Sequence, residues 1–286
     1  MKVAVLPNLT RKNAREVTEN ICRYLSEHSV KCCFENEFKG IFSDEYEYLG
    51  DDELFGGCDT IIAVGGDGSI IHAAKRALKY SKPILGVNAG NLAFMAGLES
   101  NETELLKRLI DSEYSVDRRM LLDVSIYDGG SGELIKRNTC INDVVVARSE
   151  MIKMIRLNVS RDGDRINEYY ADGIIVSTPT GTTAYSLSAG GPVVDPRIES
   201  IVLTPICTHS LFARSIIFSS DAQVCVEVPA EETQNVAVSC DGDDSVIIRS
   251  GGKIIIKKSD SFASFIRIKN DSFIDVLNSK LAQRRM

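Results

Sequence analysis

Long apolar runs are missing from the 286-residue sequence, and this absence excludes one broad class of protein. No stretch reaches the roughly 18 uninterrupted apolar residues that a membrane-spanning helix needs. The opening residues, MKVAVLPNLTRK, turn polar too soon for a secretory signal peptide. We therefore expect a cytoplasmic protein without a membrane partner.

The cysteines and histidines lack the spacing of disulfide frameworks and metal sites. The eight cysteines are scattered without a C-x-x-C pair, although Cys32 and Cys33 are adjacent. We predict that most of them are small buried hydrophobic residues. His28, His72 and His209 lie far apart and show no metal-ligand spacing, so no protein metal site is predicted.

An excess of positive charge is also missing, because the formal net charge is −7. This balance disfavours nucleic acid as a partner, while a local pocket for phosphates remains compatible with it. Apolar residues at 44% and charged residues at 26% are typical of globular proteins, and the length predicts two domains. The sequence shows neither repeats nor low-complexity tracts.

The first 117 residues alternate apolar strands with helical segments. Predicted strands lie at 2–6, 30–34, 60–64 and 84–87, and predicted helices at 13–27, 69–78 and 102–110. The strands are apolar without alternation, which is typical of a parallel sheet covered on both faces. The acidic, glycine-containing stretch 35–57 is predicted to be irregular surface chain.

The chain from 118 to 264 is predicted to be mainly β. Short β-type runs occupy 121–127, 134–139, 155–161, 174–177, 223–228, 235–239, 246–249 and 253–257. Ser250-Gly251-Gly252 predicts a hairpin between the last two runs. The predicted fold is therefore α/β, with an N-terminal parallel-sheet α/β domain at 1–117 and a mainly β domain at 118–264. A helix is expected at 273–281, and the tail 265–286 is a candidate to return to the first domain.

The segment Gly65-Gly66-Asp67-Gly68 joins a buried strand to a helix. Strand carboxyl ends and helix N-termini are places where phosphates bind, and glycines let a phosphate approach the backbone. The segment is neither a Walker A loop nor G-x-G-x-x-G. Two interpretations of Asp67 stay open: a helix cap, or a carboxylate that orients a hydroxyl nucleophile or holds Mg²⁺.

Two polar groups adjoin apolar strands in the β half. Asn142 and Asp143 begin the run NDVVVAR. One interpretation is that they only form a turn. The other is that they bind a nucleoside, because a carboxylate accepts from ribose hydroxyls and an amide pairs with a base edge. Asp172 and the hydroxyl-rich segment 177–191 flank the next apolar strand. If that segment is helical, Tyr185 and Ser188 share a face, whereas a Ser/Thr-rich loop is the alternative.

Several motifs in order along the chain together resemble the NAD kinase family. They are GGDG at 65–68, ND at 142–143, ADG at 171–173, STPTGTTAYSLSAGGP at 177–192, ICTHSLFARS at 206–215 and SCDG at 239–242. The resemblance runs from residue 60 to about 242, and STPTGTTAY is its most specific part. GGDG alone is shared with diacylglycerol, sphingosine and phosphofructokinase-type kinases.

The resemblance implies that NAD binds in a cleft between the domains and is phosphorylated to NADP by ATP or inorganic polyphosphate. Mg²⁺ or another divalent cation would accompany the donor. Asp67 is similar to the family's general base, which takes the proton from the 2′-hydroxyl of the adenosine ribose. The residues that match nucleotide-binding positions are Gly65, Gly66, Gly68, Asn142, Asp143, Lys153, Asp172, Thr183, Ala184, Tyr185 and Ser188. The resemblance further implies a homodimer or homotetramer.

The sequence departs from the family pattern at two positions. Asp143 stands where the family usually has Glu and is one methylene shorter, and Ser69 stands where Thr is frequent. Asp143 keeps the carboxylate and Ser69 keeps the hydroxyl, so we interpret both differences as adjustments of the same site that remove no required group. Alternatives to the NAD kinase prediction are a lipid or sugar kinase of the wider GGDG group and a non-catalytic NAD-sensing module. The choice of donor, NADH use and product inhibition stay open at this stage.

Overall fold

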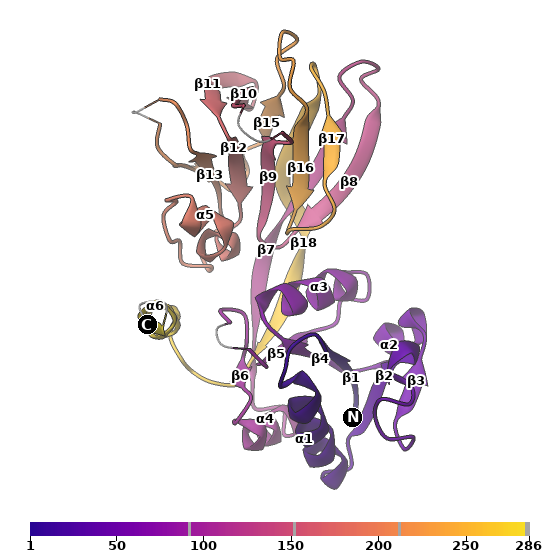
Figure 1. The fold of residues 1–286 in the computed structure, drawn as a ribbon. Coiled ribbons are helices and arrows are strands. Elements are labelled where there is room, and N and C mark those ends of the chain that lie inside the picture. Colours follow the sequence, from indigo (N-terminus) through magenta and orange to yellow (C-terminus); the bar gives the residue numbers. More distant parts are fainter. Residues whose placement is uncertain (91–92, 151–152, 211–212, 284–286) are drawn as a thin grey trace. The chain divides into compact units, whose positions relative to one another are not determined.

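The computed structural model describes residues 1–90, 93–150, 153–210 and 213–283, and the chain divides into two compact units (Figure 1). Unit 1 comprises Met1–Arg118 and Ala263–Met286, and unit 2 comprises Arg119–Phe262. The chain passes from unit 1 to unit 2 within strand β7 (Ser115–Tyr127) and returns within β18 (Lys253–Arg267).

Unit 1 contains the predicted parallel sheet, in the order β3-β2-β1-β4-β5, with β6 and the end of β18 also pairing with β5. Its strands are β1 (Lys2–Pro7), β2 (Lys31–Glu35), β3 (Glu47–Leu49), β4 (Thr60–Gly65), β5 (Ile84–Asn88) and β6 (Leu98–Glu99). β4 and β5 are buried at every position, which explains their continuous apolar sequences.

Helices cover both faces of this sheet. They are α1 (Ala14–Glu27), α2 (Asp51–Gly57), α3 (Asp67–Leu78) and α4 (Leu106–Ile110), with short 3₁₀ turns at Asn36–Phe38 and Thr103–Leu105. The C-terminal helix α6 (Phe273–Gln283) also belongs to unit 1. The chain moves from β1 to β2 in one direction across the sheet and from β4 to β5 in the other. Since such crossovers are right-handed, α1 and α3 lie on opposite faces (Figure 1).

The core of unit 1 is built from the apolar stripe of α1 and the sheet beneath it. Ile21, Cys22 and Leu25 of α1 are buried in one cluster with strand residues such as Phe34, whose ring stacks on Phe42 at 4.8 Å. Six of the eight cysteines are buried, which confirms the prediction made for most of them.

The C-terminal segment contributes to unit 1 through two polar contacts. Lys269 Nζ lies 2.8 Å from Glu102 Oε2, and Arg108 Nη1 donates to the Ile268 carbonyl at 3.0 Å. Ile266 and Ile268 are buried in the same apolar cluster as α1. These contacts fix the chain that leads into α6, whose helical conformation agrees with the prediction for 273–281.

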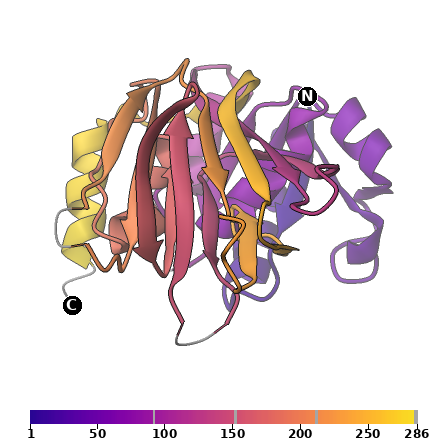
Figure 2. The same ribbon diagram turned by 90° about the horizontal axis from the view of Figure 1, so that it is seen from above.

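Unit 2 is an antiparallel β structure made of two sheets (Figure 2). One has the order β14-β13-β12-β9-β16-β17, and the other contains β11-β10-β15-β18, with β7 pairing with β18 and β8. The strands are β8 (Leu134–Cys140), β9 (Asp143–Arg148), β10 (Ile155–Arg161), β11 (Asp164–Ala171), β12 (Gly173–Ser177), β13 (Ser200–Ile206), β14 (Ile216–Ser219), β15 (Val224–Glu227), β16 (Val236–Cys240) and β17 (Val246–Ile248).

The core of unit 2 collects alternate residues from both sheets. On β9, Val144 and Val146 belong to this core, so Asp143 and Val145 point to the other face of the sheet. A 3₁₀ turn (Thr180–Thr183) and the one-turn helix α5 (Tyr185–Ser188) follow β12. The strand pattern thus places Asp143 outside the apolar core.

Three details of the predicted fold are wrong. The runs 246–249 and 253–257 do not form a hairpin, because β17 pairs with β16 whereas β18 pairs with β15 in the other sheet. The stretch 35–57 contains β3 and α2, whose acidic first turn suits the positive end of a helix dipole. Strands β11, β13 and β14 were not predicted. In the described part of the chain, no helix combines the length and the apolar character needed to cross a membrane.

The fully buried Leu25 tests the packing of α1. We expect Leu25→Ala to lower the free energy of unfolding by about 3 kcal/mol, because it removes apolar contacts and leaves a cavity. Arg23→Ala, at an exposed position of the same helix, should change it by less than about 0.5 kcal/mol. Urea denaturation measures both, and equal losses would contradict this packing.

Candidate functional site

Asp67 is the first residue of α3, but its carboxylate binds backbone groups outside that helix. Oδ2 accepts the Phe94 N–H at 3.0 Å, and Oδ1 accepts the Met95 N–H at 2.8 Å. Gly66 is the N-cap of α3, and no side chain caps the helix. The capping interpretation is therefore wrong, and the carboxylate is held in one orientation by main-chain donors that stabilise its negative charge.

The glycines before and after Asp67 differ in their surroundings. A Cβ at Gly65 would lie 2.6 Å from the Ser69 Oγ, so only glycine allows β4 and α3 to approach this closely. Ser69 Oγ in turn accepts a hydrogen bond from Asn8 Nδ2 at 2.7 Å. A Cβ at Gly68 would meet no atom within 4 Å, so the start of α3 is open on that side.

In unit 2, Asp241 fixes the backbone around Asn142 and Asp143. Its carboxylate accepts the N–H groups of Ile141 at 2.9 Å, Asn142 at 2.7 Å and Asp143 at 3.1 Å. The Asp241 N–H donates back to the Asp143 carbonyl at 2.9 Å. Asp241 therefore sets the conformation in which the chain enters β9.

The hydroxyl-rich segment is joined to the same stretch of backbone. Thr178 donates its N–H to the Asn142 carbonyl at 2.8 Å and its hydroxyl to the Ile141 carbonyl at 2.6 Å. A Cβ at Gly181 would lie 2.1 Å from the Asn142 oxygen, so glycine is required there by close packing. The segment is thus held against the predicted Asn-Asp pair.

The Asp143 carboxylate is buried, and no polar partner offsets the cost of its desolvation. Only 5% of the residue is exposed, and its side chain has no hydrogen bond or ion pair within the described chain. Burial, together with the nearby negative charge of Asp241, raises the pKa of Asp143 to about 7. Asp143 therefore changes charge near neutral pH, unlike an ordinary carboxylate.

Asp172 lies at the other end of the same strand pair. Asp143 is opposite Ser177 in the β9–β12 register, whereas Asp172 lies beside Arg148, with Nε and Oδ1 3.0 Å apart. The two ends of β9 are five residue steps apart, a distance of about 17 Å. Asp143 and Asp172 are therefore not brought together, and Asp172 is already paired.

The remaining predicted residues of unit 2 lie at or near the surface. Tyr185 and Ser188 are exposed on the single turn of α5, with 45% of Tyr185 accessible. Thr183 donates its hydroxyl to a carbonyl of the preceding turn at 3.2 Å, and Ala184 ends that turn. Lys153 is exposed and makes no polar contact with other described residues. Residues 211–212 of the 206–215 motif lie outside the described residues.

Two residues that hold the site together had no predicted role, namely Thr178 and Asp241. Both fall inside motifs of the resemblance, and Asp241 precedes Gly242 in a turn with positive φ at both residues. An Asp-Gly turn directly after an apolar strand was the available signal. Among residues 1–90, 93–150, 153–210 and 213–283, no three metal-ligating side chains gather in one place.

Comparison with known proteins agrees with this arrangement in both halves of the chain. Residues 3–114 match the ATP-NAD kinase N-terminal domain, and residues 141–268 match the ATP-NAD kinase C-terminal domain. The chain belongs to the NAD kinase family. The family resemblance drawn from the motifs is thereby confirmed, and the chain is a phosphotransferase.

Relatives match the chain along its whole length. The NAD kinase of Thermoanaerobacter sp. strain X514 is 38% identical over 286 residues, covering 99% of each chain. The NAD kinase of Acetivibrio thermocellus is 34% identical, covering 99% of this chain and 98% of its own.

Two solved structures share the fold. An NAD kinase from Archaeoglobus fulgidus in complex with ATP is 27% identical with a TM-score of 0.77, and the match covers 99% of each chain. Yeast NADH kinase complexed with NADH has a TM-score of 0.88 at 24% identity, covering 99% of this chain and 87% of its own. The mixed α/β fold class is thus confirmed.

Asp143 gives a pH-dependent prediction for stability. Since its pKa is raised from 3.8 to about 7 in the folded chain, its contribution favours folding below pH 4 and is lost as the pH rises through 7. Asp143→Asn should therefore raise the melting temperature at pH 8 by at least about 3 °C, the effect of roughly 1 kcal/mol. The gain should shrink as the pH falls toward 5.

Melting curves between pH 5 and pH 8 measure this difference. Asp221→Asn, which neutralises an exposed carboxylate of unit 2, is the matched control and should follow the wild type at every pH. Parallel curves for Asp143→Asn and the wild type would show that the Asp143 carboxylate is not strained by burial.

Proposed function

We propose that this chain transfers the terminal phosphoryl group of ATP to the 2′-hydroxyl of the adenosine ribose of NAD, giving NADP. The observation that carries the proposal is the Asp67 carboxylate, fixed by the Phe94 and Met95 N–H groups at the start of α3. Inorganic polyphosphate is the second candidate donor, since the open start of α3 offers main-chain N–H groups to any phosphate chain.

Asp67 would accept the proton of the attacking hydroxyl. In phosphoryl transfer with a loose transition state, little bond to the nucleophile has formed, so alignment of the hydroxyl matters more than the strength of the base. A carboxylate whose two oxygens each accept a main-chain N–H is suited to alignment, because these donors hold its side-chain rotamer in place.

Residues of unit 2 are assigned to binding the adenosine of NAD. We assign Asn142 and Asp143 to the adenosine, where the amide contacts the base and the carboxylate accepts from ribose hydroxyls. Burial of Asp143 without a partner supports this assignment, because a ribose hydroxyl would supply the hydrogen bond that the carboxylate lacks. Asp172, about 17 Å along the strand pair, would contact a different part of the dinucleotide.

The remaining assignments complete the dinucleotide and donor sites. Gly65, Gly66 and Gly68 would form the backbone cradle of the phosphates. We assign contacts with the dinucleotide to four residues that have small or exposed side chains, namely Thr183, Ala184, Tyr185 and Ser188. We assign a phosphate contact to the exposed Lys153.

We propose that a divalent cation binds the phosphate oxygens of the donor, and Mg²⁺ is the first candidate. The residues fit a cation held mainly by substrate, because no cluster of metal ligands is found among the described side chains and the Asp67 oxygens already accept N–H bonds. When bound, such a cation neutralises charge on the transferred group.

We also propose a cytoplasmic homodimer or homotetramer. β14 and β17 end the six-stranded sheet within unit 2 and expose Ile217 (53%) and Ile247 (49%), and exposed apolar edge strands favour pairing with another copy.

Incubation with Mg-ATP and NAD, followed by detection of NADP, tests the proposed reaction. NADP formation that saturates with NAD is the expected outcome, and a parallel reaction with inorganic polyphosphate identifies the second donor. NAD binding without NADP would indicate a sensing module. Phosphorylation of a lipid or sugar alcohol without saturable NAD binding would indicate a kinase of the wider GGDG group.

Asp67→Asn tests the role of the carboxylate. The amide keeps the volume but turns an NH₂ group toward one of the two main-chain donors, and it cannot take a proton. We expect turnover to fall at least about 10²-fold, the lower range of acid–base contributions, while the Kd for NAD stays within about threefold. Asp44→Asn, at an exposed carboxylate of unit 1, is the control. Near-normal turnover of Asp67→Asn would refute the base assignment.

A further inference from the structure

Three hydroxyl groups of unit 2 form a network that has no role in the site described above. Ser186 Oγ of α5 lies 2.9 Å from Thr204 Oγ1 of β13, and the Ser215 hydroxyl donates to Thr204 Oγ1 at 3.2 Å. Ser186 is fully buried, and only 1% of Thr204 is exposed. The network therefore joins α5, β13 and the chain that enters β14, and its central bond is shielded from water.

The backbone after α5 passes directly over this hydroxyl pair. A Cβ at Gly191 would lie 2.3 Å from Ser186 Oγ and 2.7 Å from Thr204 Oγ1, so close packing requires glycine there. The Gly191 N–H also donates to the Ser186 carbonyl at 2.8 Å. Ser186 is thus held through both its side chain and its main chain.

The helix α5 needs this support because it has only four residues. Isolated helices shorter than about 12 residues are marginal in water, so one turn does not keep its place alone. Thr182 anchors the preceding 3₁₀ turn, since its hydroxyl oxygen accepts the Val194 N–H at 3.1 Å. The Ser186–Thr204 bond is different, because it ties α5 to a strand of the six-stranded sheet.

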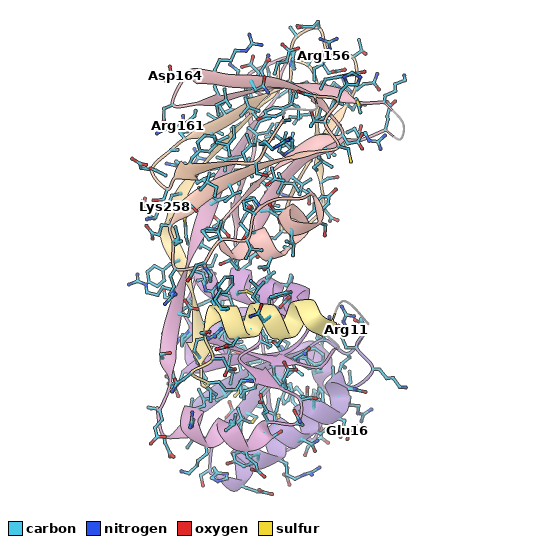
Figure 3. The ribbon with its side chains drawn as sticks, turned by 90° about the vertical axis from the view of Figure 1, so that its left-hand side faces the viewer. Arg11, Glu16, Arg156, Arg161, Asp164 and Lys258 are labelled. Carbon is cyan, nitrogen blue, oxygen red and sulfur yellow. The ribbon has the colours of Figure 1, made fainter. Side chains whose placement is uncertain are left out.

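The same turn carries two residues that the proposed function assigns to the dinucleotide. Tyr185 and Ser188 are exposed on α5, whereas Ser186 between them is buried against β13. The turn lies beside the strands of unit 2 (Figure 3). Since one turn of helix moves as a unit, the position of Ser186 sets the positions of Tyr185 and Ser188.

We propose that Thr204 is a positioning residue for NAD, whose hydroxyl holds Ser186 so that α5 presents Tyr185 and Ser188 to the dinucleotide. The inference rests on the proposed function and adds to it a residue that acts through α5, because the buried Thr204 side chain does not reach a ligand itself. Its effect is confined to NAD binding, since the donor phosphates and Asp67 are assigned to unit 1.

Two substitutions of Thr204 separate the hydrogen bond from packing. Thr204→Val replaces the hydroxyl by a methyl group of similar shape, whereas Thr204→Ser keeps the hydroxyl and loses the methyl group. We expect Thr204→Val to raise the Kd for NAD about tenfold, as the loss of a buried hydrogen bond predicts. The KM for NAD should rise equally, while kcat and the KM for ATP stay within about twofold. Thr204→Ser should bind NAD within about threefold of the wild type.

A double-mutant cycle shows whether Thr204 acts through Ser186. Ser186→Ala removes the other partner of the same bond, so it should also raise the Kd for NAD about tenfold. The double variant should bind no more weakly than the weaker single variant, because both changes break one interaction. Ser186→Ala also provides the test if Thr204→Val does not fold, which melting curves measure. Thr233→Val, at an exposed hydroxyl of unit 2, is the matched control.

Calorimetry with NAD alone measures each Kd, so the test does not depend on NADP formation. An unchanged Kd in Thr204→Val, an equal loss in Thr204→Ser, or multiplied losses in the double variant would overturn the inference. An equal rise in the KM for ATP would do the same, because it would indicate a general structural role. Any of these results with normal NADP formation would leave the proposed reaction intact, whereas a wild-type chain that binds no NAD would remove both.

Discussion

Main-chain N–H groups that hold a carboxylate are the interaction on which both units depend. In unit 1, Phe94 and Met95 each donate to one oxygen of Asp67. In unit 2, three consecutive N–H groups converge on Asp241. Main-chain donors are fixed by the fold and do not rotate as side chains do, so the carboxylates keep their places in the absence of a ligand. The site residues are therefore preorganised within each unit. Catalysis of phosphoryl transfer depends mainly on such positioning.

The same interaction separates the roles of neighbouring acids. Asp241 receives the N–H groups and stays satisfied, whereas Asp143, buried next to it, has no polar partner for its side chain among the described residues. Its pKa rises to about 7 because it is desolvated and faces the charge of Asp241. Two carboxylates with different environments can thus serve structure and ligand binding separately. The short side chain of Asp143 keeps this carboxylate close to the backbone, and only 5% of the residue is exposed.

Local patterns predicted the elements that carry the chemistry, because apolar runs, glycines and helical spacing are properties of short stretches. The strand, turn and helix around Asp67 are examples. The hydrogen-bond partners of its carboxylate are 27 and 28 residues away in the chain, and those of Asp241 are 98 to 100 residues away, so no local pattern could indicate them. The false hairpin at 250–252 has the same origin, since a turn signal does not say which sheet the next strand joins. The pairing of Asp172 with Arg148 likewise follows from the β9–β12 register and not from the ADG motif.

The proposed reaction requires that the Asp67 carboxylate contact the 2′-hydroxyl of the bound adenosine ribose. A crystal structure with NAD and a non-hydrolysable ATP analogue measures this contact directly. We expect an Asp67 oxygen within about 3.2 Å of the ribose 2′-oxygen, the reach of a hydrogen bond, while the Phe94 and Met95 N–H bonds persist. A 2′-oxygen hydrogen-bonded to another side chain, with Asp67 turned away from the ribose, would contradict it.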